Sequence, residues 1–224
     1  MADARRITVS TFGVIATLAG IEHGVGEVLQ GSVPAEGVVF LSWPDSPFFA
    51  ILGGEPAMSL IPNLLITGIL AILASLAMLV WIVTRARSRH FVAGIVLLAI
   101  AMLLVGAGFG PPLLCLMLAV AATKIGSPLS WWRNRAPARL RTTLAALWPW
   151  LYGAAIVAWL WLMPGTNIAG YYLGVDAMST VPVAMALAFG LLLLALVASI
   201  GCDACRLTKQ PQPARRLARR RGPR

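Results

Sequence analysis

Three ionisable side chains lie within six residues near the end of an apolar stretch, in the segment "GIEHGVGEVLQG" from Gly20 to Gly31. They are Glu22, His23 and Glu27. On a helix, His23 and Glu27 are four residues apart and point the same way, so they could share a proton or a metal ion. Because ionisable groups inside an apolar helix are costly, this cluster is a candidate site for a proton or small cation. A structural interpretation competes with it, in which the polar groups bind the following loop and hold it over the helices.

Drawn as a helix, the same apolar stretch separates its polar residues from those that would face lipid. The apolar stripe consists of Val14, Leu18, Ile21, Val25 and Val28. The polar cluster lies on a different side and extends to Gln30 near the surface of the membrane. Gly13, Gly20 and Gly24 lie together on a third side, where a neighbouring helix can approach closely. This pattern is typical of a site that faces the interior of a helical bundle.

Few other residues suggest chemistry. Cys202 and Cys205 form a CxxC motif, and with His90 they are weak candidates for metal ligands, since zinc requires a further ligand. Packing at helix ends is the simpler interpretation of both cysteines. No nucleotide-binding or hydrolase motif is found, and the acids that could be catalytic are Glu22, Glu27, Glu36, Asp45, Glu55 and Asp176. We therefore assign no catalytic residue, identify no cofactor and expect that the protein is not an enzyme.

The composition indicates a membrane protein. The chain is 59% hydrophobic and 12% charged, with a mean hydropathy of +0.83. A soluble domain carries roughly a quarter of charged residues, so lipid must cover much of this surface. Several nearly uncharged stretches have the length, about 20 residues, that a membrane-spanning helix needs. The sequence predicts an all-α, polytopic integral membrane helical bundle formed by a single domain, residues 1–205.

The distribution of charge predicts six transmembrane helices. The expected spans are 7–29, 60–83, 91–108, 112–127, 142–163 and 180–201. The first follows Arg5 and Arg6 and is expected to be retained rather than cleaved as a signal peptide. The stretch 91–122 could be one long helix, but two helices joined at "GAGFGPP" place all 18 Lys and Arg residues on the cytoplasmic side. We therefore expect a multi-pass protein of the cell membrane, such as a bacterial inner membrane, with both termini in the cytoplasm.

Two outer segments connect these spans. The segment between the first two is rich in proline, glycine and aromatic residues, which predicts an interfacial or re-entrant segment that packs over the helix ends. Glu55 and Asn63 could then approach Glu22 and His23. A cap that rests on the bilayer surface is the alternative. The last two spans are expected to flank an outer loop that contains "GTNIAGYYLGVD".

Residues 206–224 are expected to form a basic, disordered cytoplasmic tail, because their Pro, Gln and Arg content cannot build a core. Several arginines would contact anionic lipid headgroups: Arg215, Arg216, Arg219, Arg220 and Arg221. The net charge of +10 would suggest nucleic acid in a soluble protein, but no fold or aromatic pattern supports that partner. The lipid bilayer is therefore the expected partner, together with another membrane protein if the chain is a subunit of a complex.

Three functional hypotheses follow. The leading one is a transport or transport-accessory protein that uses the Glu22, His23 and Glu27 cluster for a proton or small cation. The first alternative is a non-catalytic structural or partner subunit of a membrane complex, docked through its glycine-rich helix faces. The second is a membrane enzyme that acts on a lipid-linked substrate from the outer side.

Overall fold

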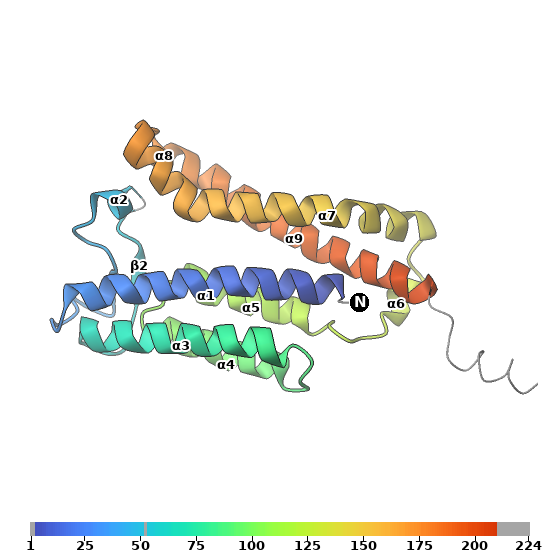
Figure 1. Ribbon diagram of the computed structural model, residues 1–224, viewed down its shortest axis with the longest axis horizontal. Coiled ribbons are helices and arrows are strands. Elements are labelled where there is room, and N and C mark those ends of the chain that lie inside the picture. Colours follow the sequence, from blue (N-terminus) through green and yellow to red (C-terminus); the bar gives the residue numbers. More distant parts are fainter. Residues whose placement is uncertain (1–2, 52, 210–224) are drawn as a thin grey trace, which may run out of the picture.

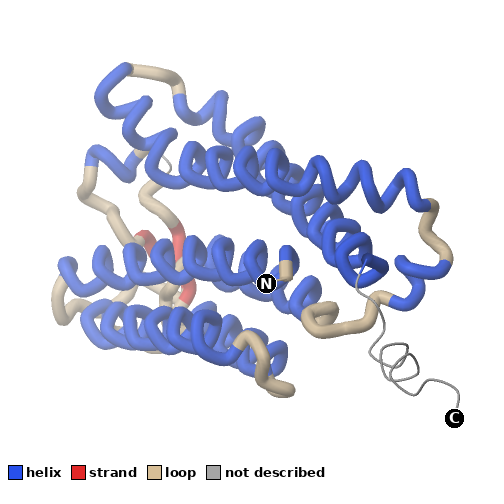
Figure 2. Tube along the Cα trace, turned by 45° about the vertical axis from the view of Figure 1, so that its right-hand side comes forward, coloured by secondary structure: helices blue, strands red, loops and turns tan. Residues whose placement is uncertain are grey.

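The computed structural model describes residues 3–51 and 53–209, which form a helical bundle with two short strands (Figures 1 and 2). The elements are α1 (Ala4–Gln30), β1 (Val39–Leu41), α2 (Pro47–Ala50), β2 (Pro56–Met58), α3 (Leu64–Arg85), α4 (Phe91–Leu104), α5 (Gly110–Ala122), α6 (Ser130–Asn134), α7 (Ala138–Leu160), the π-helix η1 (Trp161–Gly165), α8 (Thr166–Leu173) and α9 (Ala177–Lys209). The predicted all-helical class is confirmed.

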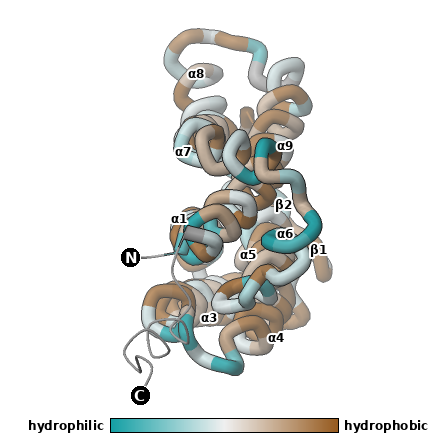
Figure 3. The backbone as a smooth tube through the Cα atoms, turned by 90° about the vertical axis from the view of Figure 1, so that its right-hand side faces the viewer, coloured by the Kyte–Doolittle hydropathy of each residue, from teal (hydrophilic) through white to brown (hydrophobic). Residues whose placement is uncertain are grey.

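Four helices in the described part of the chain are long and apolar enough to cross a membrane: Ala4–Gln30, Leu64–Arg85, Ala138–Leu173 and Ser179–Thr208. Two shorter apolar helices, α4 and α5, pack against each other. The ambiguous stretch 91–122 is thus divided into two helices, with a turn at Val105–Phe109. Hydrophilic segments gather at the end of the bundle that carries the N-terminus and α6 (Figure 3). These features support a helical, multi-pass membrane protein.

Several element bounds differ from those predicted. Helix α5 ends at Ala122 rather than near residue 127, because the chain turns there. Much of the expected outer loop after residue 163 is helical, since η1 carries α7 on into α8. Pro164 lies inside this π-turn and has no backbone N–H to donate, which a widened turn accommodates.

The basic tail also begins later than expected. Helix α9 extends to Lys209, so residues 206–209 are helical rather than part of a disordered tail. The arginines assigned to lipid headgroups, Arg215, Arg216, Arg219, Arg220 and Arg221, lie outside the described residues.

A buried ion pair joins the first and last helices at the end of the bundle that carries the N-terminus. The Arg5 Nε donates to Asp203 Oδ2 at 2.7 Å, and the backbone N–H groups of Ala4 and Arg5 donate to the same carboxylate. Asp203 therefore satisfies two of the free N–H groups at the start of α1. A second nitrogen of Arg5 donates to the Lys124 carbonyl, which ties the end of α5 to the same point. Sequence analysis did not foresee this pairing.

Helices α1 and α3 cross with their backbones in direct contact. A Cβ atom built on Gly68 would lie 2.6 Å from the Gly24 carbonyl oxygen, and one on Gly24 would lie 2.8 Å from the Gly68 carbonyl oxygen. Gly13 and Gly20 also face residues of α3, namely Ile82 and Ser75. The predicted glycine side of α1 is therefore its packing face, as small residues at a helix crossing allow.

We predict that Gly68→Ala destabilises the protein by about 1–3 kcal/mol, because the new methyl group forces α1 and α3 apart. Gly153→Ala in α7 is the matched control, since no atom lies within 4 Å of a Cβ built there. Its effect should stay within about 1 kcal/mol and favour the helix. Thermal unfolding in detergent measures both, and equal unfolding temperatures for the two variants would contradict the close crossing.

Candidate functional site

A β-hairpin brings polar side chains onto the C-terminal half of α1. Strands β1 and β2 are antiparallel, and their pairing continues through the hydrogen bond from Ser42 N to the Glu55 carbonyl oxygen, at 3.1 Å. The hairpin rests on α1 at Gly26, where any side chain would overlap the Ser42 carbonyl and the Trp43 ring. This is how the segment predicted to fold back over the helix ends reaches the cluster.

The structure brings Glu22, His23, Glu27 and Glu55 together with Ser42. His23 Nδ1 lies 3.7 Å from Glu55 Oε2 and 3.3 Å from Ser42 Oγ. The Ser42 hydroxyl donates to Glu27 Oε1 at 3.3 Å, so it links the histidine to the second glutamate. Glu27 is completely buried, and the side chains of His23 and Glu55 are 7% and 11% exposed. Sequence analysis missed Ser42, because nothing in its neighbourhood distinguishes it from other loop serines.

Two glycines in the turn between α4 and α5 form the opposite wall of the cluster. A Cβ atom on Gly106 would lie 2.6 Å from both carboxylate oxygens of Glu27, and one on Gly108 would overlap the His23 ring. Both glycines have positive φ angles, +96° and +73°, which other residues rarely adopt. The "GAGFG" motif was interpreted only as a turn. Glycine is needed at positions 106 and 108 for two reasons. The backbone conformation has a positive φ angle, and a side chain would overlap the cluster.

Several acceptors in the cluster have no hydrogen-bond partner among the described residues. They are Glu22 Oε1, Glu27 Oε2, Glu55 Oε2 and Asn167 Oδ1. Asn167 of α8 is 1% exposed and lies beside the Glu55 carboxyl group. The sequence contains no Lys or Arg between Ile7 and Thr84, so the acids that converge here have no basic side chain from α1, the hairpin or most of α3. Buried acceptors without donors attract a proton or a cation.

Three of these residues have the spacing of metal ligands. One donor atom from each of Glu22, His23 and Glu55 lies within 4.8 Å of the others. A nitrogen and two carboxylate oxygens suit zinc and other divalent transition metals. Within the described residues, the donors of His90, Cys202 and Cys205 do not form such a group. His90 is exposed at the start of α4, whereas Cys202 is buried in α9, so this weak metal assignment stays a prediction.

Gln30 and Asn63 form hydrogen bonds of a structural kind. The Gln30 amide donates to the carbonyl oxygens of Leu41 and Ser42, at 3.2 and 2.9 Å, and so fastens the hairpin to the end of α1. Asn63 caps α3 by accepting from Ile66 N at 3.1 Å, and it donates to Ser32 Oγ at 3.1 Å. The structural interpretation therefore fits Gln30 and Asn63.

Comparison of this chain with protein-family models, curated proteins and solved structures finds no match. Function is therefore inferred from the geometry of the cluster.

Burial raises the pKa of the Glu55 carboxyl group above its ordinary value of 4.5, although contacts with Glu22 and Asn167 oppose the shift. A raised pKa in the folded state means that the protonated acid favours folding. The stability contributed by Glu55 is thus complete below pH 4.5 and is lost as the pH rises through the higher, folded-state pKa.

We predict that Glu55→Gln reduces the loss of thermal stability on raising the pH from about 5 to about 8, because glutamine cannot ionise. Unfolding temperatures are measured in detergent. As the pH increases, the unfolding temperature of the variant should rise relative to that of the wild type. Glu36→Gln, which removes an exposed acid, should follow the wild-type curve. Parallel curves for wild type and Glu55→Gln would contradict the effect of burial.

Proposed function

We propose that this chain is a transport or transport-accessory protein of the cell membrane that handles a proton or small cation at the Glu22, His23, Glu27 and Glu55 cluster. One observation carries the proposal. Buried carboxylate oxygens converge on one another and leave acceptors without donors, in a region of the sequence without Lys or Arg. A positive charge is what such a group lacks.

The cluster differs from a structural clamp in how its polar groups are used. Gln30 acts as a clamp, because its amide donates to two carbonyl oxygens of the hairpin. Within the part of the chain that the structure describes, Glu22, Glu27 and Glu55 each retain an oxygen without a hydrogen-bond partner. A group kept only for stability would be expected to satisfy its acceptors, since each unsatisfied one costs about 1–3 kcal/mol.

We further propose six spans with both termini in the cytoplasm, in which α4 and α5 are the third and fourth. The turn between them contacts the segment after β2, through the hydrogen bond from Leu60 N to the Leu104 carbonyl oxygen. The opposite end of α5 meets Arg5. The two helices therefore run between the ends of the bundle, although at 14 and 13 residues they span only about 20 Å each. The cluster then faces the outer side.

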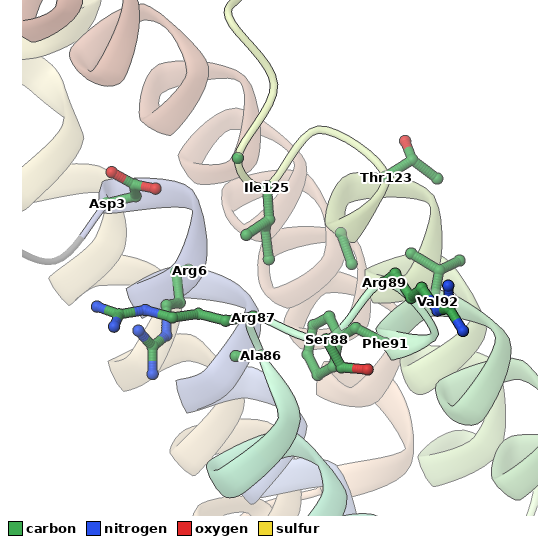
Figure 4. A pocket seen from close by; sticks show the side chains of 12 residues that line it. Asp3, Arg6, Ala86, Arg87, Ser88, Arg89, Phe91, Val92, Thr123 and Ile125 are labelled. Carbon is green, nitrogen blue, oxygen red and sulfur yellow. The ribbon is translucent and has the colours of Figure 1, made fainter.

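A basic hollow at the opposite end supports this orientation. It has a volume of about 470 Å³ and is lined by Arg6, Arg87 and Arg89 beside Asp3 (Figure 4). Lys and Arg collect on the cytoplasmic side of membrane proteins, where anionic lipid headgroups attract them. The tail arginines carry the same charge, and we propose the same contact with headgroups for them.

We predict that Glu22→Gln and Glu27→Gln reduce proton or cation flux at least about ten-fold at normal folded yield, because an amide retains hydrogen bonding but not charge. Flux is measured in proteoliposomes with a pH-sensitive dye and with added monovalent and divalent cations. Leucine at either position should instead lower the folded yield. Glu36→Gln, an exposed acid on the same side, is the control. Wild-type flux in both Gln variants would end the proposal.

A further inference from the structure

A pocket of about 260 Å³ opens beside the cluster, between α1 and the continuous helix formed by α7, η1 and α8. Its walls are mostly apolar and include the rings of Phe48, Phe49 and Trp159, with Leu18 and Met163. Leu18 belongs to the predicted lipid-facing stripe of α1 and is 55% exposed, so the pocket can be entered from the lipid side.

The course of the helices explains why a pocket forms here. Near the N-terminal end of α1, the Tyr152 hydroxyl lies 2.7 Å from Thr11 Oγ1, and Trp148 Nε1 donates to Thr8 Oγ1 at 3.1 Å. These side-chain hydrogen bonds link α7 to α1. Beyond the π-turn, α8 bends away from α1 (Figure 1). The π-turn at Trp161–Gly165 contributes Met163 and Pro164 to the pocket wall, and π-turns within α-helices are frequent at functional sites.

The polar part of the pocket is rich in acceptors. Glu22, Glu55 and Asn167 line it, and each has a buried oxygen without a hydrogen-bond partner among the described residues. Asn167 is only 1% exposed, which is unusual for a polar side chain. An occupant of this pocket must therefore bring hydrogen-bond donors or positive charge to one end and apolar surface to the other.

We propose that the pocket binds an organic cation with a hydrophobic body, namely a lipophilic amine in its ammonium form. This proposal rests on the proposed function and names its substrate class. The ammonium group lies between Glu22 and Glu55, and the hydrophobic body lies against the aromatic rings, where apolar surface is buried. A cavity of about 150 Å³ holds benzene, so this pocket accommodates roughly ten to fifteen non-hydrogen atoms.

The walls distinguish this occupant from an inorganic ion. A metal ion loses its water shell only when protein ligands replace most of it, and Glu22, His23 and Glu55 supply three such ligands. The remaining surface of the pocket is apolar and aromatic, and His23 is not part of the lining. An ammonium group attached to a hydrophobic body gains from both parts of the pocket.

Binding to the purified full-length chain in lipid nanodiscs tests the proposal with three probes of similar size, namely phenylbutylamine, phenylbutanol and phenylbutyrate. We expect the amine to bind at least about ten-fold more tightly than the neutral alcohol or the anion, measured by calorimetry. Glu22→Gln and Glu55→Gln should each weaken amine binding at least about ten-fold, and Glu36→Gln should leave it unchanged. Ala19→Leu should weaken all three probes by filling the pocket, which provides a test independent of the acids.

Two results would overturn the proposal. Equal affinity for the amine and the alcohol, unaffected by Glu22→Gln and Glu55→Gln, would show an ordinary apolar cavity. Stoichiometric binding of Zn²⁺ that is lost in His23→Gln, together with no amine binding, would show a site for an inorganic ion. These results are distinguishable from a failure of the proposed function. Amine binding without flux would contradict the transport proposal and support the proposed ligand of the pocket. Conversely, if flux depends on Glu22 but no amine binds, the proposed ligand of the pocket is contradicted and the transport proposal is supported.

Discussion

The backbone contact between α1 and α3 at Gly24 and Gly68 determines where the ionisable residues of this protein can lie. Lipid cannot satisfy a carboxylate, so the polar side of α1 must be covered by protein. Close approach to α3 turns that side of α1 towards the interior. There the turn between α4 and α5 closes over His23 and Glu27, because Gly106 and Gly108 leave room for their side chains. A bulkier crossing would move α1 away from this turn and open the cluster to lipid.

The polar side of α1 could be predicted from the sequence, since helical periodicity alone decides which residues share a face. The partners of that side could not. Ser42 and Asn167 lie 15 and 140 residues from Glu27 along the chain, and neither follows a recognisable motif. The ion pair of Arg5 with Asp203 was missed for the same reason, because complementary charges at two helix ends become neighbours only once the helices are packed. Residues 166–173 continue the helix because of the π-turn around Pro164. The sequence did not predict this, because proline usually ends a helix.

The two ends of the bundle treat buried charge in opposite ways. Arg5 and Asp203 neutralise each other, and the carboxylate also accepts from backbone N–H groups, so that end is closed and complete. At the other end, Glu22, Glu27 and Glu55 leave acceptors unused within the described residues. Removing one partner of a buried ion pair lowers the stability of the fold. A ligand that binds to unpaired buried acceptors raises the stability instead. The completed ion pair and the proposed binding cluster therefore lie at different ends of the same helix, α1.

The depth of Glu22 has an electrical consequence. It lies eight residues before the C-terminal end of α1, or about 12 Å along the helix axis. With the proposed orientation, a positive charge that reaches this carboxylate from outside crosses part of the membrane voltage. The full voltage is worth about 2.3 kcal/mol per elementary charge for each 100 mV. If the cluster binds cations as proposed, a membrane that is negative inside would draw them towards Glu22 and depolarisation would release them, so the membrane voltage would set how fully the cluster is occupied.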